Sequence, residues 1–504
     1  MGSLCPMKNL YPNKSKRIMI VALNPQFTIR NEEKCSYIIK KIWNIDPIIG
    51  ENTDSVTLIP PVMGYILSTI GQTEYEASLK SLSNTLGVSK DSIRHFTSSL
   101  IENEEQKELK IGSDTIRFPQ RLLIKSDYPI KTDTLIPNTS FQLLHLRPQI
   151  PININFMVTT KCTTNCSYCY ANRNLKTELK TEEIVHFIEE CKKLGIVNLS
   201  LTGGDIFAHT DWKTIIATVT KNEYKPFLST KTPLNEEDIK FLHDTGIQEL
   251  QFSLDSIEPK ILSQLIQVND NYLSKVYNTF KYCEKYGIKL CVRSVLCAIN
   301  SQVNQIENLL SFLKGFTNIK DWVMTPAFFS EFKQEEYHKN EVSNENLIKI
   351  KDFIKETTKT FPIYLSKISK CGYKLKKNST VYDYVKKNQI CQANSYTMSV
   401  LASGECTICE MLYENEEYSL GNIKELSLNE IWNSPKALSL FSPEQNETST
   451  SSPCHTCEVF DECKKKLDKR ICYVDIAKTN EGITKDLPDP RCPLSKPINV
   501  ILYL

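Results

Sequence analysis

The feature that most constrains this chain is a group of three closely spaced cysteines, Cys162, Cys166 and Cys169. Their Cys-x3-Cys-x2-Cys spacing does not suit mutual disulfides, because two thiols would pair and the third would be left over. Three thiolates can instead converge on one inorganic cluster, since soft sulfur ligands select iron–sulfur clusters, zinc or cuprous copper. Structural zinc normally takes four protein ligands in two separated pairs. The loop therefore favours a four-iron cluster with one open iron, and a zinc loop or a set of buried cysteines is the alternative.

Composition limits where such a loop can work. The chain has 504 residues, too many for one hydrophobic core, and this length predicts about three domains. It has no apolar run near about 18 residues, so we expect no membrane span. Met1 to Arg17 lack the apolar core of a secretory signal, and we therefore expect a cytoplasmic protein. In that reducing compartment, the 18 cysteines favour metal binding or catalysis over disulfides.

Residues 151–330 alternate between strand-like and helix-like segments. The expected strands lie at 152–158, 198–201, 227–229, 249–254, 289–296 and 322–325. This alternation favours an α/β fold with a parallel sheet and outer helices, whose active site lies at the carboxyl ends of the strands. The cysteine loop directly follows the first strand. Residues 127–150 contain three prolines and predict a linker, and 331–390 are expected to form a bridging helical region.

The cysteine loop, with Tyr170 after it, resembles the signature of the radical S-adenosylmethionine (SAM) enzymes. The resemblance implies that the six strand–helix units form the open, partial (β/α)6 barrel of that family. It also implies that Cys162, Cys166 and Cys169 hold a [4Fe-4S] cluster whose fourth iron binds SAM. One electron from the cluster would cleave SAM into methionine and a 5′-deoxyadenosyl radical, which abstracts a hydrogen from the substrate.

Gly203-Gly204-Asp205 follows the second strand and resembles the Gly-Gly-Glu element of the same family. A diglycine permits close backbone approach, and the family element accepts hydrogen bonds from the methionine ammonium of SAM. Aspartate in place of glutamate keeps the carboxylate but shortens its reach. An ordinary glycine turn is the alternative. The resemblance also places Tyr168, which lies between two cluster ligands, beside the adenine.

Polar residues end the later strands and are further candidates for contact with SAM. Thr230, within Ser229-Thr230-Lys231, ends the third strand, and Ser253 and Asp255 end the fourth on one face. We expect the latter pair near the ribose of SAM, and the alternative is a polar strand end that meets solvent. Arg293 on the fifth strand is expected to pair with the methionine carboxylate.

Cysteines become dense again in residues 391–504. The first block holds Cys391, Gly404 and Cys409, and the second holds Cys454, Cys457 and Cys463, followed by Cys472 and Cys492. This pattern resembles the SPASM extension of radical SAM enzymes, and the resemblance implies two auxiliary iron–sulfur clusters, which we expect to be [4Fe-4S]. Carried over from that family, the first auxiliary cluster takes Cys391, Cys409 and Cys472. The second takes Cys454, Cys457, Cys463 and Cys492.

The chain departs from the family pattern at one of these positions. The family places its sixth cysteine four residues after the fifth, but Leu467 stands there and the next cysteine is Cys472. Cys371 or Cys406 is therefore an alternative ligand for the first auxiliary cluster. A zinc ribbon of Cys391, Cys409, Cys454 and Cys457 is another alternative, and it leaves the other cysteines unused. We expect the remaining cysteines to be buried in cores: Cys5, Cys35, Cys191, Cys283, Cys291 and Cys297.

Residues 17–126, after a tail at 1–16, predict a winged-helix-like α+β module. We expect strands at 17–23 and 37–39 and a strand–Gly–strand pair at 109–118. We also expect three helices: the first opens at Pro60-Pro61, the second spans 74–86, and the third begins at Ser89. Across 17–125 the module holds 13 basic and 13 acidic side chains, and its third helix offers Lys90, Arg94 and His95. This balance argues against DNA. The module resembles the peptide-recognition domain of many peptide-modifying radical SAM enzymes, in which a leader peptide adds to a sheet edge.

Together the resemblances imply a radical SAM oxidoreductase that matures a ribosomally made precursor peptide by forming a thioether or carbon–carbon side-chain cross-link. An open iron in the first auxiliary cluster would favour the thioether, and full ligation would favour electron transfer. We expect a reductant such as ferredoxin or flavodoxin as a partner, and neither nucleic acid nor membrane, since 61 basic side chains face 59 acidic ones. The alternatives are a sulfatase-maturase-like enzyme that oxidises Cys or Ser to formylglycine, and an iron–sulfur redox-sensing winged-helix regulator.

Overall fold

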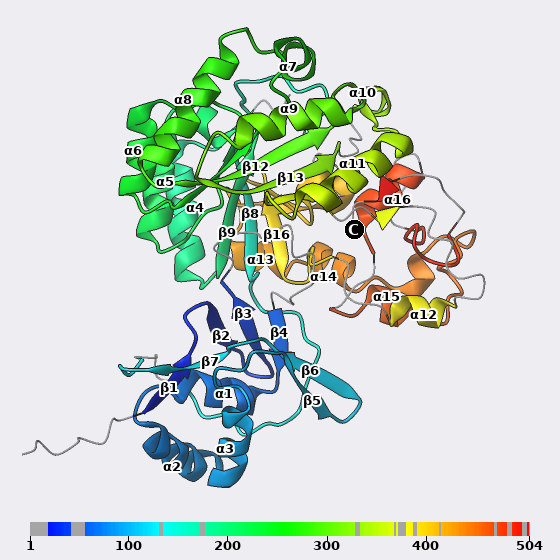
Figure 1. Cartoon of the computed structure of the whole chain (residues 1–504). Helices are drawn as coiled ribbons and strands as arrows, with labels where there is room; N and C mark the ends of the chain where they lie inside the picture. Colours follow the sequence, from blue (N-terminus) through cyan, green and yellow to red (C-terminus); the bar gives the residue numbers. More distant parts are fainter. Residues whose placement is uncertain are drawn as a thin grey trace, which may run out of the picture. The chain divides into compact units, whose positions relative to one another are not determined.

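The chain divides into two compact units, which are described separately (Figure 1). The first comprises Met1–Lys40 and Asp54–Leu144, and the second comprises Lys41–Thr53 and His145–Leu504. The computed structural model describes residues 19–41, 56–130, 135–171, 177–327, 333–366, 369–370, 380–386, 391–412, 415–467, 471–480, 486–495 and 501–502. The boundary at residues 144 and 145 falls inside the segment that the sequence predicts as a linker.

The first unit is a three-stranded antiparallel sheet with three helices and two strand pairs. The sheet has the order β2 (Phe27–Asn31), β3 (Ser36–Lys40) and β4 (Val56–Ile59), and β1 (Ile20–Leu23) pairs separately with β7 (Leu123–Ser126). The helices are α1 (Pro61–Thr69), α2 (Tyr75–Leu86) and α3 (Lys90–Ser98), and the hairpin is β5 (Lys107–Ile111) and β6 (Asp114–Phe118). Strands β2, β4 and β7 were not predicted, because each is only four or five residues long and depends on a partner strand.

Local signals in the sequence set the ends of these helices. Pro61 opens α1 at a position where its missing N–H costs nothing. Helix α2 ends at Gly87, whose φ of 67° is left-handed, and α3 begins after Ser89, whose side chain accepts from the Ser92 N–H. These three helices were therefore placed correctly from sequence alone.

The cations of α3 are engaged within the unit. Arg94 donates to both carboxylate oxygens of Glu76 on α2, and Lys90 Nζ lies 2.7 Å from Glu76 Oε2. The α3 surface therefore offers less free positive charge to a DNA backbone than its sequence suggests.

The Glu76 contact makes the packing of α2 on α3 sensitive to acid. Hydrogen bonds from Arg94 and Lys90 lower the pKa of Glu76 from 4.5 to about 2. Because the pKa of Glu76 is lower in the folded than in the unfolded chain, its ionised carboxylate stabilises the fold at pH values above 4.5. This stabilisation is lost as the pH falls from 4.5 toward 2. We expect amide hydrogen exchange in α2 and α3, corrected for its intrinsic pH dependence, to accelerate as the pH falls through this range. Glu76→Gln should remove this dependence and Asp91→Asn should keep it; an unchanged profile in Glu76→Gln would contradict the assignment.

The second unit contains the predicted strand–helix repeats. Its strands form two five-stranded sheets, with the orders β10-β11-β12-β13-β14 and β18-β17-β16-β8-β9. The six predicted strands are all present: β8 (Asn153–Thr159), β9 (Asn198–Gly203), β10 (Ser229–Thr230), β11 (Glu249–Ser253), β12 (Lys289–Leu296) and β13 (Ile319–Pro326). The neighbouring pairs β8–β9, β10–β11, β11–β12 and β12–β13 are parallel. The predicted α/β partial barrel is confirmed.

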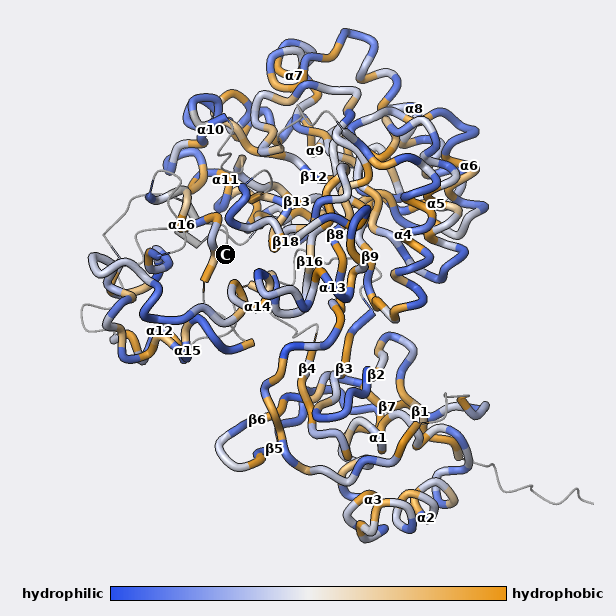
Figure 2. The backbone as a smooth tube through the Cα atoms, turned by 180° about the vertical axis from the view of Figure 1, so that it is seen from behind, coloured by the Kyte–Doolittle hydropathy of each residue, from blue (hydrophilic) through white to orange (hydrophobic). Residues whose placement is uncertain are grey.

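Six amphipathic helices lie outside these strands (Figure 1). They are α4 (Thr181–Lys193), α5 (Trp212–Lys221), α6 (Glu236–Asp244), α7 (Pro259–Ile266), α8 (Tyr272–Lys285) and α9 (Val303–Leu313). Their apolar sides pack on the sheets, as in the ring pairs Phe156–Phe187 and Phe252–Phe280, whose centroids lie 4.9 and 5.2 Å apart. Figure 2 shows the resulting contrast between apolar strands and mixed helices. This core fixes the strand ends that carry the polar residues.

The region after the barrel is joined to it through the sheets. Strand β14 (Ile363–Leu365) pairs in parallel with β13, and β16 (Thr397–Val400) pairs in parallel with β8. Strands β17 (Glu405–Thr407) and β18 (Ser419–Asn422) continue that second sheet. The predicted bridging region thus contains a barrel-sheet strand besides α10 (Gln334–Asn340), α11 (Asn344–Thr357), α12 (Val381–Val385) and β15 (Ser369–Lys370), which pairs with β19 (Ile501–Leu502).

The last part of the chain holds short helices: α13 (Leu428–Trp432), α14 (Pro435–Phe441), α15 (Phe460–Lys464) and α16 (Tyr473–Thr479). Arg147 ties this part to the start of the second unit, because its guanidinium donates to Asn394 and Trp432 and stacks 3.4 Å from the Trp432 ring centre. None of the described helices is long and apolar enough to cross a membrane.

Candidate active site

The cysteine loop begins at the carboxyl end of β8, as the sequence predicts. The thiols of Cys162 and Cys166 both lie 3.5 Å from Thr164 Oγ1, and Cys169 N–H donates to Cys166 O at 3.2 Å. The loop is pinned to α7, because Asn165 and Ser167 donate to the backbone carbonyls of the last two residues of that helix. Three thiols held on one tight loop are a donor set that fits a four-iron cluster.

Glu178 fixes the first turn of this loop. Its carboxylate accepts from Thr159 Oγ1 at 2.9 Å, from Thr160 N and Oγ1 at 2.8 and 2.9 Å, and from Lys161 Nζ at 3.2 Å. Burial raises the pKa of Glu178, but these hydrogen bonds outweigh it and leave the pKa below its ordinary value. Sequence reasoning missed this residue, since nothing in its neighbourhood marks a contact made across the loop.

The two glycines of Gly203-Gly204-Asp205 are needed for contact with the cysteine loop itself. A Cβ on Gly203 would lie 2.4 Å from Thr159 O, and one on Gly204 would lie 2.1 Å from Lys161 O. Gly204 N–H and Asp205 N–H donate to these two carbonyls at 2.7 and 2.8 Å. The sequence predicts that the diglycine lets a ligand approach closely. In this structure the group that approaches Gly203 and Gly204 is the backbone of the cysteine loop, and their contact with SAM stays a prediction.

We expect Gly204→Ala to disrupt the cysteine loop, because backbone atoms of Lys161 cannot move aside as a flexible side chain could. SAM cleavage should fall by about 100-fold, the scale of a roughly 1 Å misplacement in an active site. The measurement is 5′-deoxyadenosine formation by the reconstituted protein. Gly315→Ala is the control, since its added methyl would meet only Phe312 O at 3.2 Å. Wild-type turnover in Gly204→Ala would show that the loop tolerates displacement.

Asp205 is buried and engaged with the end of β10. Its Oδ2 accepts from Thr230 Oγ1 at 2.7 Å, Lys231 N at 3.1 Å, and Thr232 N and Oγ1 at 3.2 and 2.8 Å. Its Oδ1 accepts from Phe207 N at 3.0 Å. The carboxylate thus joins the predicted SAM turn to the next strand. Contact of Asp205 and Thr230 with SAM stays a prediction.

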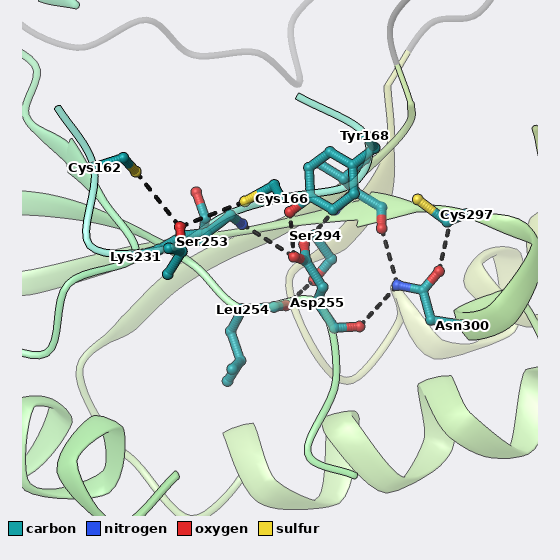
Figure 3. Close-up of polar contacts among 12 residues, drawn as sticks. Cys162, Cys166, Tyr168, Lys231, Ser253, Leu254, Asp255, Ser294, Cys297 and Asn300 are labelled. Atoms are coloured by element: carbon teal, nitrogen blue, oxygen red, sulfur yellow. Dashed lines mark hydrogen bonds and ion pairs between the residues drawn. The ribbon is translucent and has the colours of Figure 1, made fainter. Parts of the chain in front are cut away.

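Asp255 is the centre of a buried polar cluster (Figure 3). Its Oδ2 accepts from the Tyr168 hydroxyl and from Lys231 Nζ, the latter at 3.0 Å, and its Oδ1 accepts from Val295 N at 2.8 Å. Asn300 Nδ2 donates to the Asp255 backbone carbonyl at 3.0 Å. Burial and the nearby Asp255 charge raise the pKa of Tyr168, so its hydroxyl keeps its proton and donates.

The structure therefore joins two predicted SAM-site residues, Tyr168 and Asp255, by a direct hydrogen bond. Lys231 is the member of this cluster to which the sequence assigned no role, although it follows Thr230 at the end of a predicted strand. Ser253 lies nearby on β11, where Gln251 Nε2 donates to its hydroxyl at 3.3 Å.

Arg293 lies on β12 and contacts the adjacent strand. It forms an ion pair with Asp321 on β13 and donates to Val292 O at 2.8 Å. Its second terminal nitrogen, Nη2, is buried and has no hydrogen-bond partner among the described residues. Pairing of Arg293 with the methionine carboxylate stays a prediction.

The four cysteines assigned to the second auxiliary cluster line one pocket. Cys454, Cys457, Cys463 and Cys492 share it with hydrophobic side chains and with Lys464, which is only 2 % exposed. Gln445 Nε2 donates to the backbone carbonyls of Cys454 and Cys457 at 3.0 and 2.9 Å and fixes their turn. Four thiols are the number that a [4Fe-4S] cluster takes, and the role of these four as its ligands stays a prediction.

The cysteines assigned to the first auxiliary cluster are also neighbours. Burial raises the pKa of both Cys409 and Cys472, and the charge of Cys391 contributes to each shift. Cys472 N–H donates to Asp489 Oδ2 at 2.9 Å, which links this set to the pocket of the second.

Cys406 and Cys371 are the alternative ligands for the first auxiliary cluster. Cys406 is fully buried, and its electrostatic neighbours are Glu405, Glu190 and the core thiol of Cys191. This placement disfavours Cys406 as a ligand, whereas Cys371 lies outside the described residues. The expected burial of Cys35, Cys191, Cys283, Cys291 and Cys297 is confirmed, and Cys5 lies outside the described residues.

Glu410 connects the two cysteine regions. It follows Cys409, and its carboxylate accepts from Thr202 Oγ1 at 2.9 Å and from the Tyr170 hydroxyl at 3.5 Å. Thr202 precedes the diglycine and Tyr170 follows Cys169. Burial raises the pKa of Glu410, and the two hydrogen bonds oppose that rise. The first auxiliary region therefore lies next to the radical SAM site, a contact over more than 200 residues that sequence spacing does not reveal.

Comparison with known proteins agrees with this geometry. Residues 156–313 match the radical SAM superfamily, and residues 391–458 match SPASM, an iron–sulfur cluster-binding domain. The chain is 28% identical over 172 residues to the GTP 3′,8-cyclase of Nautilia profundicola, covering 32% of this chain and 52% of the cyclase. It thus spans about half the length of that relative. It is 22% identical over 358 residues to the PqqA peptide cyclase of Granulibacter bethesdensis, covering 68% of this chain and 88% of that protein.

A solved structure shares the fold over nearly the whole chain. SuiB of Streptococcus suis, bound to its precursor peptide SuiA, matches 94% of this chain and 100% of its own, with a TM-score of 0.60 and 15% identity. The matched domains contain Cys162, Cys166 and Cys169, and five cysteines of the C-terminal region: Cys391, Cys406, Cys409, Cys454 and Cys457. The iron–sulfur match disfavours the zinc alternatives. The chain therefore contains a radical SAM domain and a SPASM domain, and its cofactors are SAM and iron–sulfur clusters.

Proposed function

We propose that this protein modifies a ribosomally synthesised precursor peptide, forming a thioether or a carbon–carbon cross-link between side chains. The observation that carries the proposal is the Glu410 contact, which brings the first auxiliary region to the end of β9 and to the cysteine loop. A substrate residue bound near Glu410 would be close both to the source of the radical and to an auxiliary cluster. The peptide cyclase relative and the fold shared with SuiB support a peptide as substrate.

The chemistry requires two capacities. With cluster and SAM bound, the site supplies a 5′-deoxyadenosyl radical that removes a hydrogen atom from the substrate. Closing a cross-link then releases one proton and one electron. The second auxiliary set, with four cysteines around one pocket, suits a cluster that accepts this electron. If three cysteines hold the first auxiliary cluster, one of its irons can bind a substrate thiolate, which favours a thioether. If a fourth ligand is present, the cluster can only transfer electrons.

This chain's own residues orient the site. Glu178 and the diglycine hold the cysteine loop against β9, and Asp255 holds Tyr168 and Lys231 beside it. We propose that Tyr168, Gly203, Gly204, Asp205, Thr230, Ser253, Asp255 and Arg293 line the SAM site. A small reductant such as ferredoxin or flavodoxin would supply the initiating electron.

We further propose that the N-terminal module, residues 17–126, binds the leader of the precursor. Its antiparallel β2–β3–β4 sheet suits strand addition, in which backbone hydrogen bonds supply affinity. The engagement of Lys90 and Arg94 by Glu76 favours this role over DNA binding and hence over the redox-sensing regulator.

Removing residues 1–144 should weaken binding of the precursor at least about tenfold, because the backbone hydrogen bonds to the leader are lost. SAM cleavage in the absence of peptide should persist, since the shortened chain keeps all the assigned cysteines, from Cys162 to Cys492. Fluorescence anisotropy of a labelled precursor measures the affinity. Unchanged affinity would reject the leader-binding role.

Mass spectrometry tests the reaction. The reconstituted protein, SAM, dithionite and a candidate precursor peptide should yield a product that has lost two hydrogen atoms. Alkylation with iodoacetamide distinguishes the products, because a thioether consumes a free thiol and a carbon–carbon link does not. Conversion of Cys or Ser to an aldehyde would instead identify the formylglycine-forming alternative.

A further inference from the structure

A buried lysine lies at the centre of the radical SAM site. Lys231 follows β10, and its side chain is 12% exposed, whereas that of its partner Asp255 is fully buried. The Lys231 backbone is fixed on both sides, because its N–H donates to Asp205 and its carbonyl accepts from the Tyr272 hydroxyl at 2.9 Å. The Lys231 backbone is therefore fixed by Asp205 and Tyr272, and its ammonium group is held by Asp255 at 3.0 Å.

The position of this ammonium is defined by the cysteine loop as well as by Asp255. Lys231 Nζ lies 5.5 Å from the centre of the Tyr168 ring, and Tyr168 stands between two cluster ligands. The charges that act on Lys231 are those of Asp255, Cys166 and Cys162. Figure 3 shows Lys231 directed to Asp255 between the thiols of Cys162 and Cys166 and the Tyr168 ring. Its positive charge thus faces the loop that holds the cluster.

The charge balance at this place is otherwise negative. Three thiolates, Asp205 and Asp255 surround the site, and each electron that enters the cluster adds one more negative charge. Charges interact more strongly in a buried region than in water. A fixed cation there stabilises the reduced cluster relative to the oxidised one and makes the cluster easier to reduce.

We propose that Lys231 is the counter-charge of the radical-generating cluster and raises its reduction potential. The residue would not touch the reacting atoms of the substrate; it acts on the electron-transfer step that precedes SAM cleavage. The proposal rests on the cofactor assignment and is independent of which peptide is modified.

Lys161 offers a matched control in the same loop. It precedes Cys162 in the chain, but its side chain is 61% exposed and its Nζ lies 3.2 Å from Glu178. Solvent and salt screen an exposed charge, whereas the Lys231 charge is shielded from both. Removal of the same charge at the two positions therefore separates a buried counter-charge from a general effect of lysines near the cluster.

A redox titration followed by electron paramagnetic resonance tests the proposal without peptide. Because SAM binds the open iron, the signal that changes on SAM addition identifies this cluster among the three. At a fixed potential, Lys231→Gln should lower the ratio of reduced to oxidised cluster about tenfold, which equals about 59 mV for a one-electron couple. Lys231→Arg and Lys161→Gln should stay near wild type.

Two results would overturn the proposal: a wild-type potential in Lys231→Gln, or an equal shift in Lys161→Gln. If the Lys231→Gln variant does not retain the cluster, the reduction potential of the Asp255→Asn variant is measured instead. Loss of that carboxylate leaves the Lys231 charge unopposed, so the potential should rise, and an unchanged or lower potential would contradict the assignment. Since no peptide is present, failure here leaves the proposed peptide modification untouched.

Discussion

Replacement of Cys162, Cys166 and Cys169 together with alanine is expected to reduce SAM cleavage by at least about a thousandfold. These thiols are the ligands that the cysteine loop offers, and their removal leaves no route to the radical. The auxiliary cysteines lie elsewhere in the second unit, so the variant should retain the iron bound there. The measurement is 5′-deoxyadenosine formed with dithionite, combined with iron and sulfide content.

The control for this experiment is Cys191→Ala. Cys191 is fully buried in α4 and belongs to none of the three ligand sets. Its loss creates a small cavity but should leave cluster content and turnover close to wild type. Persistent SAM cleavage in the triple variant would remove the basis for the active-site assignment.

Replacement of Cys454 and Cys463 with alanine is expected to abolish peptide cross-linking while 5′-deoxyadenosine formation continues. Both residues line the pocket assigned to the second auxiliary cluster, and two remaining thiols cannot hold a [4Fe-4S] cluster. The electron released when the cross-link closes would then lack its acceptor. Iron content should fall by about four atoms per chain, the content of one such cluster.

The readout that separates this loss from general misfolding is the ratio of 5′-deoxyadenosine to cross-linked peptide. The ratio should rise steeply in Cys454→Ala/Cys463→Ala and stay at the wild-type value in Cys283→Ala, which removes a buried core thiol. Cross-linking at the wild-type rate in the double variant would show that this pocket is not needed for the reaction.

The barrel was largely predictable because its signals are local. Each predicted strand is a run of alternating or continuous apolar residues, and each following helix has one apolar face. Strands β14 and β16 were not predicted as members of the barrel sheets, because three- and four-residue strands carry little local signal. Their pairing with β13 and β8 depends on contacts between distant parts of the chain.

The residues of the candidate site also divide into those that local sequence signals predict and those that depend on distant contacts. Its cysteines and Gly203-Gly204 were predictable, because ligand spacing and the need for a missing Cβ are visible in the sequence. Glu178, Lys231 and Glu410 were missed, since their importance comes from partners that folding brings near. Asp205 shows the limit most clearly. Its position in the motif was recognised, but four of its five protein hydrogen bonds come from residues 230–232 at the end of β10, which only folding brings near.

Deuterium transfer tests the central claim most directly. The reconstituted protein would be incubated with dithionite, SAM and a candidate precursor peptide that is deuterated at its carbon positions. The account predicts deuterium in 5′-deoxyadenosine and a cross-linked peptide formed in equal amount. Formation of 5′-deoxyadenosine without deuterium, together with unmodified peptide, would contradict the claim that this site acts on a peptide.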